Sequence, residues 1–410
     1  MHPQVHGWKD RLLRMGVSRL GLLGALMTSG VSANAVLPLV AQQQIAEKLG
    51  SEGHYQLFLN ATTLFAFPFL VCSQFLLKGK RTRTVARAGF TLLMLLNSIL
   101  YLTDLQWHPL ALRALVGIVF GLTIPMGQFS LAAAELDEHE RVSQFTMMLN
   151  LVALGLSVIP FAGIGILWIS HGNASLLFLA LACVSGILAI LSSKWIEPDS
   201  YVHQCKLRDL RLTDRQRAIA IADGSVILLT RSAYALVLVW LSQIISNFGH
   251  QQIISLSFTL PFLIWGFTAL PLLRRLQPLQ SLLAFLVTPF ALLALALASG
   301  NSSILPALLA GIALLSIPEA FTPGQMISQW QSSASRQFGN VLTMALMTIG
   351  LSAGPAALMG LYQLGTRWPL VNQPSTWNSS LWLLILLLPL MIVFIRKVWV
   401  KVLIPPLKRH

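Results

Sequence analysis

Apolar residues run along this chain in long stretches that short polar breaks separate. A helix of about 20 apolar residues crosses the hydrocarbon core of a bilayer. Twelve stretches reach about that length, near 18–42, 54–76, 86–103, 109–133, 143–169, 174–193, 225–247, 252–273, 279–299, 303–325, 339–362 and 379–399. The pattern predicts an all-α integral membrane protein with 12 transmembrane helices.

The composition excludes a water-soluble fold. Of the 410 residues, 55% are hydrophobic and 10% charged, whereas a soluble domain carries about 25% charged residues. The three cysteines are too far apart for a disulfide framework or a metal site. Neither a glycine-rich nucleotide loop nor a hydrolytic group of side chains is visible, so we expect no cofactor, no metal and no enzymatic activity.

Basic residues predict the orientation in the membrane. The net charge is +14, yet the basic residues lie in short loops, which indicates a membrane protein rather than one that binds nucleic acid. If the N-terminus is cytoplasmic, 24 of the 28 Lys and Arg face the cytoplasm, and only Lys48 and Arg367 face the other side. Since basic loops are retained inside, we expect both termini in the cytoplasm and the chain in the cell's inner membrane.

The two halves of the chain repeat each other. Gly155-Leu156-Ser157 in the fifth stretch matches Gly350-Leu351-Ser352 in the eleventh, at an offset of 195 residues. Arg141 and Arg336 repeat at the same offset. An even number of helices per half makes the repeats parallel. We therefore predict a six-helix bundle over 1–193, a cytoplasmic central loop over 194–224 and a second six-helix bundle over 225–410.

With these features the chain resembles the major facilitator superfamily of secondary transporters. Arg113 followed by Gly117 is similar to the family's Arg-x3-Gly pattern in the fourth helix. The glycines and prolines that resemble the family's efflux-type motif, with its repeat in the eleventh helix, are Gly155, Pro160, Gly163, Gly350, Gly354 and Pro355. The resemblance implies two halves that rock around a central site, with these glycines and prolines allowing helices to slide at the seam between the halves.

One motif departs from the family pattern. The loop after the second helix usually carries an aspartate in this family, and Leu77 stands in its place before the basic Lys78-Gly79-Lys80-Arg81. The resemblance implies that the usual ionic latch between this loop and neighbouring helices is altered here.

Three charged residues fall inside predicted helices, where a charge is costly enough to suggest a function. They are Arg113, Arg231 and Glu319. Arg113 either faces the central site or extends its head to the interface. Arg231 and Glu319 lie at matching depths, and the resemblance places their helices around the cavity. They form either a proton-carrying pair or a permanent ion pair.

Polar and aromatic residues within the helices are further candidates. Asn34 and Asn150 either bind a polar substrate or join helices by hydrogen bonds. Tyr234 shares a helix face with Arg231 and either lines a cavity or packs.

The sequence thus predicts a monomeric secondary transporter in the lipid bilayer, which exports a small organic compound in exchange for protons. A siderophore or other metabolite carrier is the alternative within transport. A membrane sensor with the same fold that transports nothing is the alternative outside it.

Overall fold

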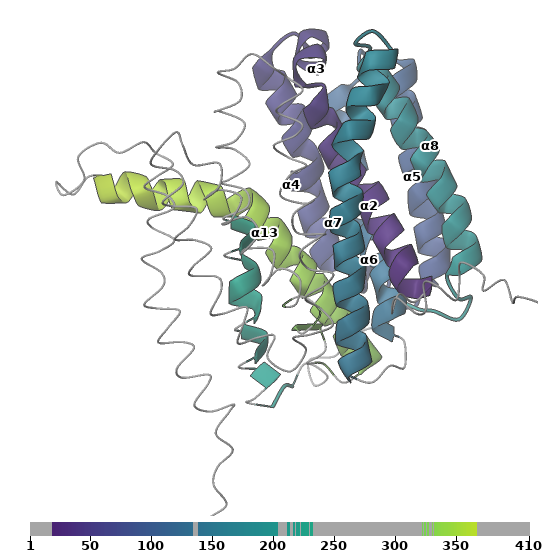
Figure 1. Cartoon of the computed structure of the whole chain (residues 1–410), viewed down its shortest axis with the longest axis vertical. Coiled ribbons are helices and arrows are strands. Elements are labelled where there is room, and N and C mark those ends of the chain that lie inside the picture. Colours follow the sequence, from purple (N-terminus) through teal and green to yellow (C-terminus); the bar gives the residue numbers. More distant parts are fainter. Residues whose placement is uncertain are drawn as a thin grey trace, which may run out of the picture. The chain divides into compact units, whose positions relative to one another are not determined.

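The computed structural model describes residues 19–133, 138–203, 211–213 and 332–366, with most of 216–232 and part of 322–330. The described elements are helical, apart from one isolated β-bridge (Figure 1). Their bounds are α2 (Arg19–Val40), α3 (Gln42–Leu49), α4 (Glu52–Leu76), α5 (Thr82–Leu102), α6 (Pro109–Ala133), α7 (Glu138–Ile169), α8 (Ser175–Trp195) and α13 (Ser333–Thr366). Residues between 216 and 232 are also helical.

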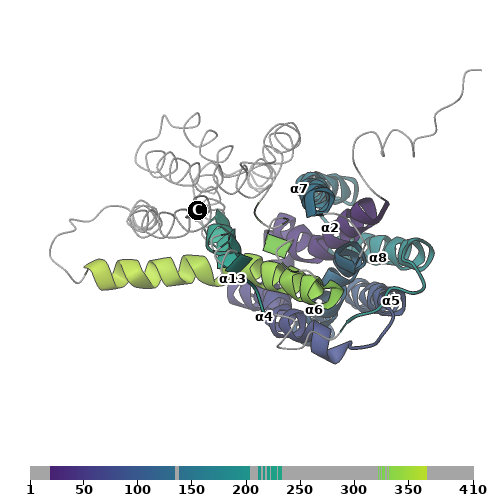
Figure 2. The ribbon, with the colours of Figure 1, turned by 90° about the horizontal axis from the view of Figure 1, so that it is seen from below.

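The predicted spans of the N-terminal half are confirmed. Within the described residues six helices are long and apolar enough to cross a membrane: α2, α4, α5, α6, α7 and α8. They begin and end within a few residues of the predicted stretches, and α13 covers the predicted span 339–362. The spanning helices form a bundle that Figure 2 shows nearly end-on.

The chain divides into two compact units. One comprises Met1–Cys205 together with Ser332–Val341, and the other comprises Lys206–Gln331 with Leu342–His410. The first turns of α13 therefore belong to the N-terminal unit, and the rest of this helix belongs to the second. The predicted boundaries at 193 and 225 stay a prediction.

Glycines on α6 bring this helix against α4. A Cβ added at Gly117 would collide with the carbonyl oxygen of Thr62, and one added at Gly121 would collide with that of Ala66. In membranes, where water does not drive helices together, such small residues allow close backbone packing. The Gly-x3-Gly pattern of α6 thus fixes its contact with α4.

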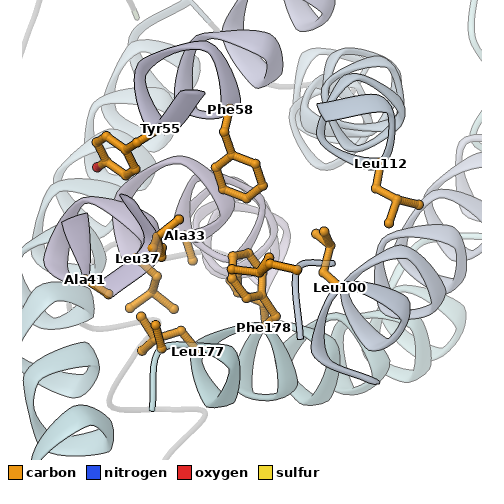
Figure 3. Packing of buried hydrophobic residues seen from close by; sticks show 13 residues of the cluster. Ala33, Leu37, Ala41, Tyr55, Phe58, Leu100, Leu112, Leu177 and Phe178 are labelled. Carbon is orange, nitrogen blue, oxygen red and sulfur yellow. The ribbon is translucent and has the colours of Figure 1, made fainter. Parts of the chain in front are cut away.

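An apolar cluster closes the end of the bundle that carries α3. Side chains from α2, α4, α5, α6 and α8 meet there (Figure 3). Phe58 and Phe178 pack edge to face with ring centroids 6.1 Å apart, a favoured aromatic geometry. Tyr55 lies beside Phe58 on α4 and is also fully buried.

The short helix α3 is not predicted by the search for long apolar stretches. It ends at Gly50, whose φ of 81° suits glycine, and Ser51 then caps α4 through the amide of His54. Lys48 in the last turn of α3 forms an ion pair with Asp104, in the loop after α5. The hydroxyl of Ser175 also donates to Asp104, so this carboxylate links three segments.

We predict that this linkage weakens in acid. The hydrogen bonds from Lys48 and Ser175 hold the pKa of Asp104 below its usual 3.8. A lowered pKa in the folded state gives stability that is present above the unfolded-state value and is lost as pH falls through the folded-state value. The Asp104 side chain is 54% exposed, so we expect about 0.2–1 kcal/mol, as for surface ion pairs.

The test compares thermal unfolding of the solubilised full chain at about pH 6 and about pH 3, the interval in which carboxylates titrate. Asp104→Asn should unfold at lower temperature than the wild type at pH 6, and the difference should shrink at pH 3. Asp199→Asn, which changes an exposed aspartate, is the control. A pH-independent difference would contradict this account of Asp104.

Candidate functional site

Arg113 lies wholly inside the N-terminal bundle. Its side chain is 0% exposed, so it does not extend to the interface. One Nη donates to the backbone carbonyl of Asn34 on α2 at 2.8 Å. The guanidinium carbon also lies 4.9 Å from the centroid of the Phe58 ring on α4. This ring, labelled in Figure 3, provides a cation–π contact.

The guanidinium lacks a counter-charge among the described residues. Its Nε and the other Nη are buried and have no hydrogen-bond partner there. A buried charge is costly unless it is paired and hydrogen-bonded. Arg113 is therefore a positive centre with two unused donors, suited to an anionic group.

Next to Arg113, two asparagines join neighbouring helices. The Asn97 amide on α5 donates to Oδ1 of Asn34 at 2.9 Å, and the Asn34 amide donates to the carbonyl of Val31 at 3.2 Å. Of the two predicted roles, the helix-joining one is therefore present for Asn34. Oδ1 of Asn97 is buried without a partner in the described region. Sequence reasoning did not single out Asn97, although it is a polar residue in the middle of an apolar stretch.

Asn150 on α7 differs from Asn34. It is 0% exposed, and neither atom of its amide has a hydrogen-bond partner among the described residues. Because buried amides normally form hydrogen bonds, Asn150 stays a candidate for binding a polar substrate.

In the second unit, Arg231 is buried, with 6% of its surface exposed. A Cβ added at Gly350 of α13 would lie 2.6 Å from the Cβ of Arg231, so the two helices touch there. Glu319 and Tyr234 lie outside the described residues. The predicted pairing of Arg231 with Glu319 therefore stays a prediction.

Asp223 is an acid that sequence reasoning assigned to the central loop. It lies instead in a helical stretch, is 0% exposed, and neither carboxylate oxygen has a partner in the described part of the chain. Its face also carries Ile227, Thr230 and Arg231, all buried. Ile227 lies four residues after Asp223, and Thr230 and Arg231 lie three and four residues after Ile227, as on one face of a helix. Extending that pattern back by one turn from the apolar stretch would have placed Asp223 in the helix.

The glycines expected at the seam form close contacts inside their own units. A Cβ at Gly155 would lie 2.5 Å from Oγ of Ser29, and one at Gly163 would lie 2.8 Å from Leu37, both on α2. Pro160, between these glycines on α7, is buried. Gly354 and Pro355 lie within α13. A sliding role for these residues stays a prediction.

Amide side chains occupy the region where the aspartate of the latch is missing. The Gln74 amide, near the end of α4, donates to the carbonyls of His203 at 2.8 Å and Ala334 at 2.9 Å. The Gln337 amide donates to the carbonyl of Tyr201 at 3.0 Å and accepts from the His203 amide at 2.8 Å.

All of these residues belong to the N-terminal unit. Arg336 adds a hydrogen bond of 2.8 Å to the carbonyl of Ala132 at the end of α6. We call the side chains of Gln74, Gln337 and Arg336 the amide clamp, because two of the three are neutral amides. The clamp fastens the start of α13 to the N-terminal bundle through hydrogen bonds from side chains to backbone carbonyls.

Solved structures of three transport proteins share this fold. The human organic anion transporter MFSD10 (TETRAN) matches with a TM-score of 0.61 and 15% identity over 95% of this chain and 100% of its own. The Escherichia coli fucose:proton symporter FucP matches with a TM-score of 0.64 and 16% identity, over 92% of this chain and 98% of its own. A bacterial homologue of the iron transporter ferroportin matches with a TM-score of 0.63 and 14% identity, over 92% of this chain and 98% of its own.

No protein-family model and no curated protein matches the sequence. The structural matches confirm the predicted fold class, the 12-helix fold of major facilitator transporters. They are transporters and not enzymes, which agrees with the expectation drawn from the sequence. The chain is a multi-pass membrane protein. At these identities the matches establish the fold and not the substrate.

We predict that the amide clamp protects the segment after the first bundle from solvent exchange. Gln337→Leu removes the acceptor of the His203 amide, and a lost buried hydrogen bond costs about 1–3 kcal/mol. Deuterium uptake at His203 in the full chain should therefore accelerate at least about fivefold. Gln74→Leu should accelerate uptake in the same segment. Gln43→Leu, at an exposed position of α3, should leave it unchanged, and equal uptake in all three variants would refute the clamp.

Proposed function

We propose that this protein is a secondary transporter that exports a small organic compound across the cell's inner membrane in exchange for protons, by alternating access. The observation that carries the proposal is a charged side chain, Arg113, buried in a transporter fold with two donors unused. A purely structural arginine would gain from a full set of hydrogen bonds. A binding residue must keep donors for its ligand.

The chemistry of Arg113 favours an anionic cargo. A guanidinium offers two parallel N–H groups that match a carboxylate, and no described carboxylate forms an ion pair with it. The Phe58 ring beneath it and the apolar residues around it would accept an apolar body. We therefore propose an organic anion with a carboxylate or similar group. The match to an organic anion transporter supports this class.

Two acids, Asp223 and Glu319, are the candidates for the proposed proton coupling. Asp223 has no partner for its carboxylate among the described residues, and burial without a partner favours the proton-bound form. An acid that releases its proton when water reaches it, and takes one up when buried, links proton movement to the conformational cycle. Glu319 is the second candidate, with Arg231 as its predicted partner.

Export as the direction rests on the resemblance of Gly155, Pro160 and Gly163 to the efflux-type motif. The contacts of Gly155 and Gly163 with α2 are close enough for larger side chains to disturb. A metabolite carrier of either direction would share the fold and the buried charges. A sensor would not need an acid that titrates, so the proton experiment below separates the two classes.

We predict that Arg113 confers selectivity for anions. Benzoate, phthalate and citrate serve as anionic probes. Benzamide is the neutral control compound and benzylamine is the cationic one. At least one carboxylate should raise the unfolding temperature of the purified full chain by about 1–2 °C, because about 1 kcal/mol of binding gives about 2–4 °C in a chain of roughly half this length. Arg113→Gln should lose this response, and Arg113→Lys should retain part of it.

The matched control is Arg87→Gln, which removes an exposed arginine of α5 and should respond as the wild type does. Unfolding temperatures without ligand show whether each variant is folded, and so separate a loss of binding from a loss of stability. A response to benzylamine or benzamide as large as that to the carboxylates would contradict an anionic cargo.

We predict that proton coupling depends on buried acids. In proteoliposomes with an imposed pH gradient, flux of the best carboxylate probe should lose most of its gradient dependence in Asp223→Asn or in Glu319→Gln. Flux by exchange without a gradient should persist, since a neutral isostere retains binding. Glu197→Gln, at an exposed position, is the control. Undiminished gradient-driven flux in both Asp223→Asn and Glu319→Gln would rule out the proton-carrying role.

A further inference from the structure

A groove of about 570 Å³ lies between α5 and α6, at the end of the bundle where α4 turns into α5. Its walls are apolar and come from both helices, with Val85, Ala88 and Leu92 on α5 and Val119 and Leu122 on α6. Leu92 is 48% exposed. The groove takes no part in the site around Arg113, and its residues are not used in the proposed transport.

Two basic residues stand at the mouth of the groove. Lys80 and Arg81 both line it and both are exposed. Arg81 is held in place because its Nε donates to the hydroxyl of Tyr201 at 3.3 Å and its guanidinium carbon lies 5.9 Å from the centroid of that ring. The backbone is fixed as well, since Gly79 donates to Val202 at 2.9 Å and Val202 donates to Lys80 at 3.0 Å. The positive charge is therefore built into the mouth.

A polar group without a partner lies in the wall. Thr123 of α6 lines the groove and is 1% exposed, and its hydroxyl has no hydrogen-bond partner among the described residues. A Cβ added at Gly89 of α5, which also lines the groove, would collide with this hydroxyl. The Thr123 hydroxyl is thus packed against Gly89 behind the apolar wall of the groove.

The exposed side chains around the groove indicate that it faces lipid. Leu92 and Leu95 on α5 and Leu115 on α6 are each 47–49% exposed, and these helices cross the membrane. From Arg81 to Leu92 the helix rises about 17 Å at 1.5 Å per residue. The hydrocarbon of one leaflet is about 15 Å thick, half the bilayer core. A lipid chain therefore fits along the groove with its headgroup at the basic mouth.

We propose that this groove binds a phospholipid with an anionic headgroup. The negative phosphate lies between Lys80 and Arg81, and an acyl chain lies along Val85, Ala88 and Leu92. Basic pockets between transmembrane helices recognise anionic headgroups in this way. A soluble anion would use the basic mouth alone and would gain nothing from the apolar walls.

The experiment uses native mass spectrometry of the full chain in detergent, titrated with dipalmitoyl phosphatidylglycerol. Dipalmitoyl phosphatidylcholine serves as the zwitterionic match and glycerol 3-phosphate as the soluble headgroup. We expect phosphatidylglycerol to bind at least tenfold more tightly than either. Lys80→Gln/Arg81→Gln should remove that preference, and Ala88→Trp should weaken binding of phosphatidylglycerol at least fivefold by filling the groove.

The matched control is Arg87→Gln with Lys78→Gln, which removes the same charge from exposed residues outside the groove lining and should keep the preference within twofold. Unfolding temperatures without lipid show whether each variant is folded. Equal affinity for phosphatidylcholine, equal affinity for glycerol 3-phosphate, an equal loss in the control, or unchanged binding in Ala88→Trp would each overturn the proposal.

Discussion

A charge inside the hydrocarbon region is the constraint around which the N-terminal bundle is arranged. Arg113 meets three helices at once: its own α6, the carbonyl of Asn34 on α2 and the ring of Phe58 on α4. The contact with α4 continues in step along both helices, because Gly117 meets Thr62 and Gly121 meets Ala66. Each step is four residues on each helix. The two helices therefore run parallel, and the glycines that allow their backbones to touch also hold the aromatic ring over the guanidinium.

The same kind of close contact recurs in both units. Gly155 of α7 lies against Ser29 of α2, and Gly350 of α13 lies against Leu228 and Arg231 in the helical residues 216–232. In each case the glycine with the repeated Gly-Leu-Ser signature belongs to the later helix and touches the earliest described helix of its unit. An internal duplication of a six-helix bundle accounts for this correspondence. A sliding contact of the predicted kind would then operate twice in one molecule.

The sequence predicted the described spanning helices well because their signal is local. Twenty apolar residues must form a helix in a bilayer, whatever surrounds them. The sequence did not reveal α3, which is too short and too polar for that rule, nor Asp223, whose helix extends beyond the apolar stretch. Asn97 was also missed, since its role depends on Asn34 on another helix. Contacts between helices depend on packing, and the hydropathy of one helix does not show which residue of another helix it will contact.

The amide clamp shows how a missing charge alters the chemistry of a contact without removing it. Leu77 cannot form an ionic latch, yet Gln74 and Gln337 reach the backbone of Tyr201, His203 and Ala334. Amide hydrogen bonds do not titrate, and salt screens them far less than an ion pair. Protonation of a buried acid such as Asp223 would therefore leave this contact unchanged. In a proton-coupled cycle, that separation would let protonation act on the second unit while the start of α13 stays fastened to the first.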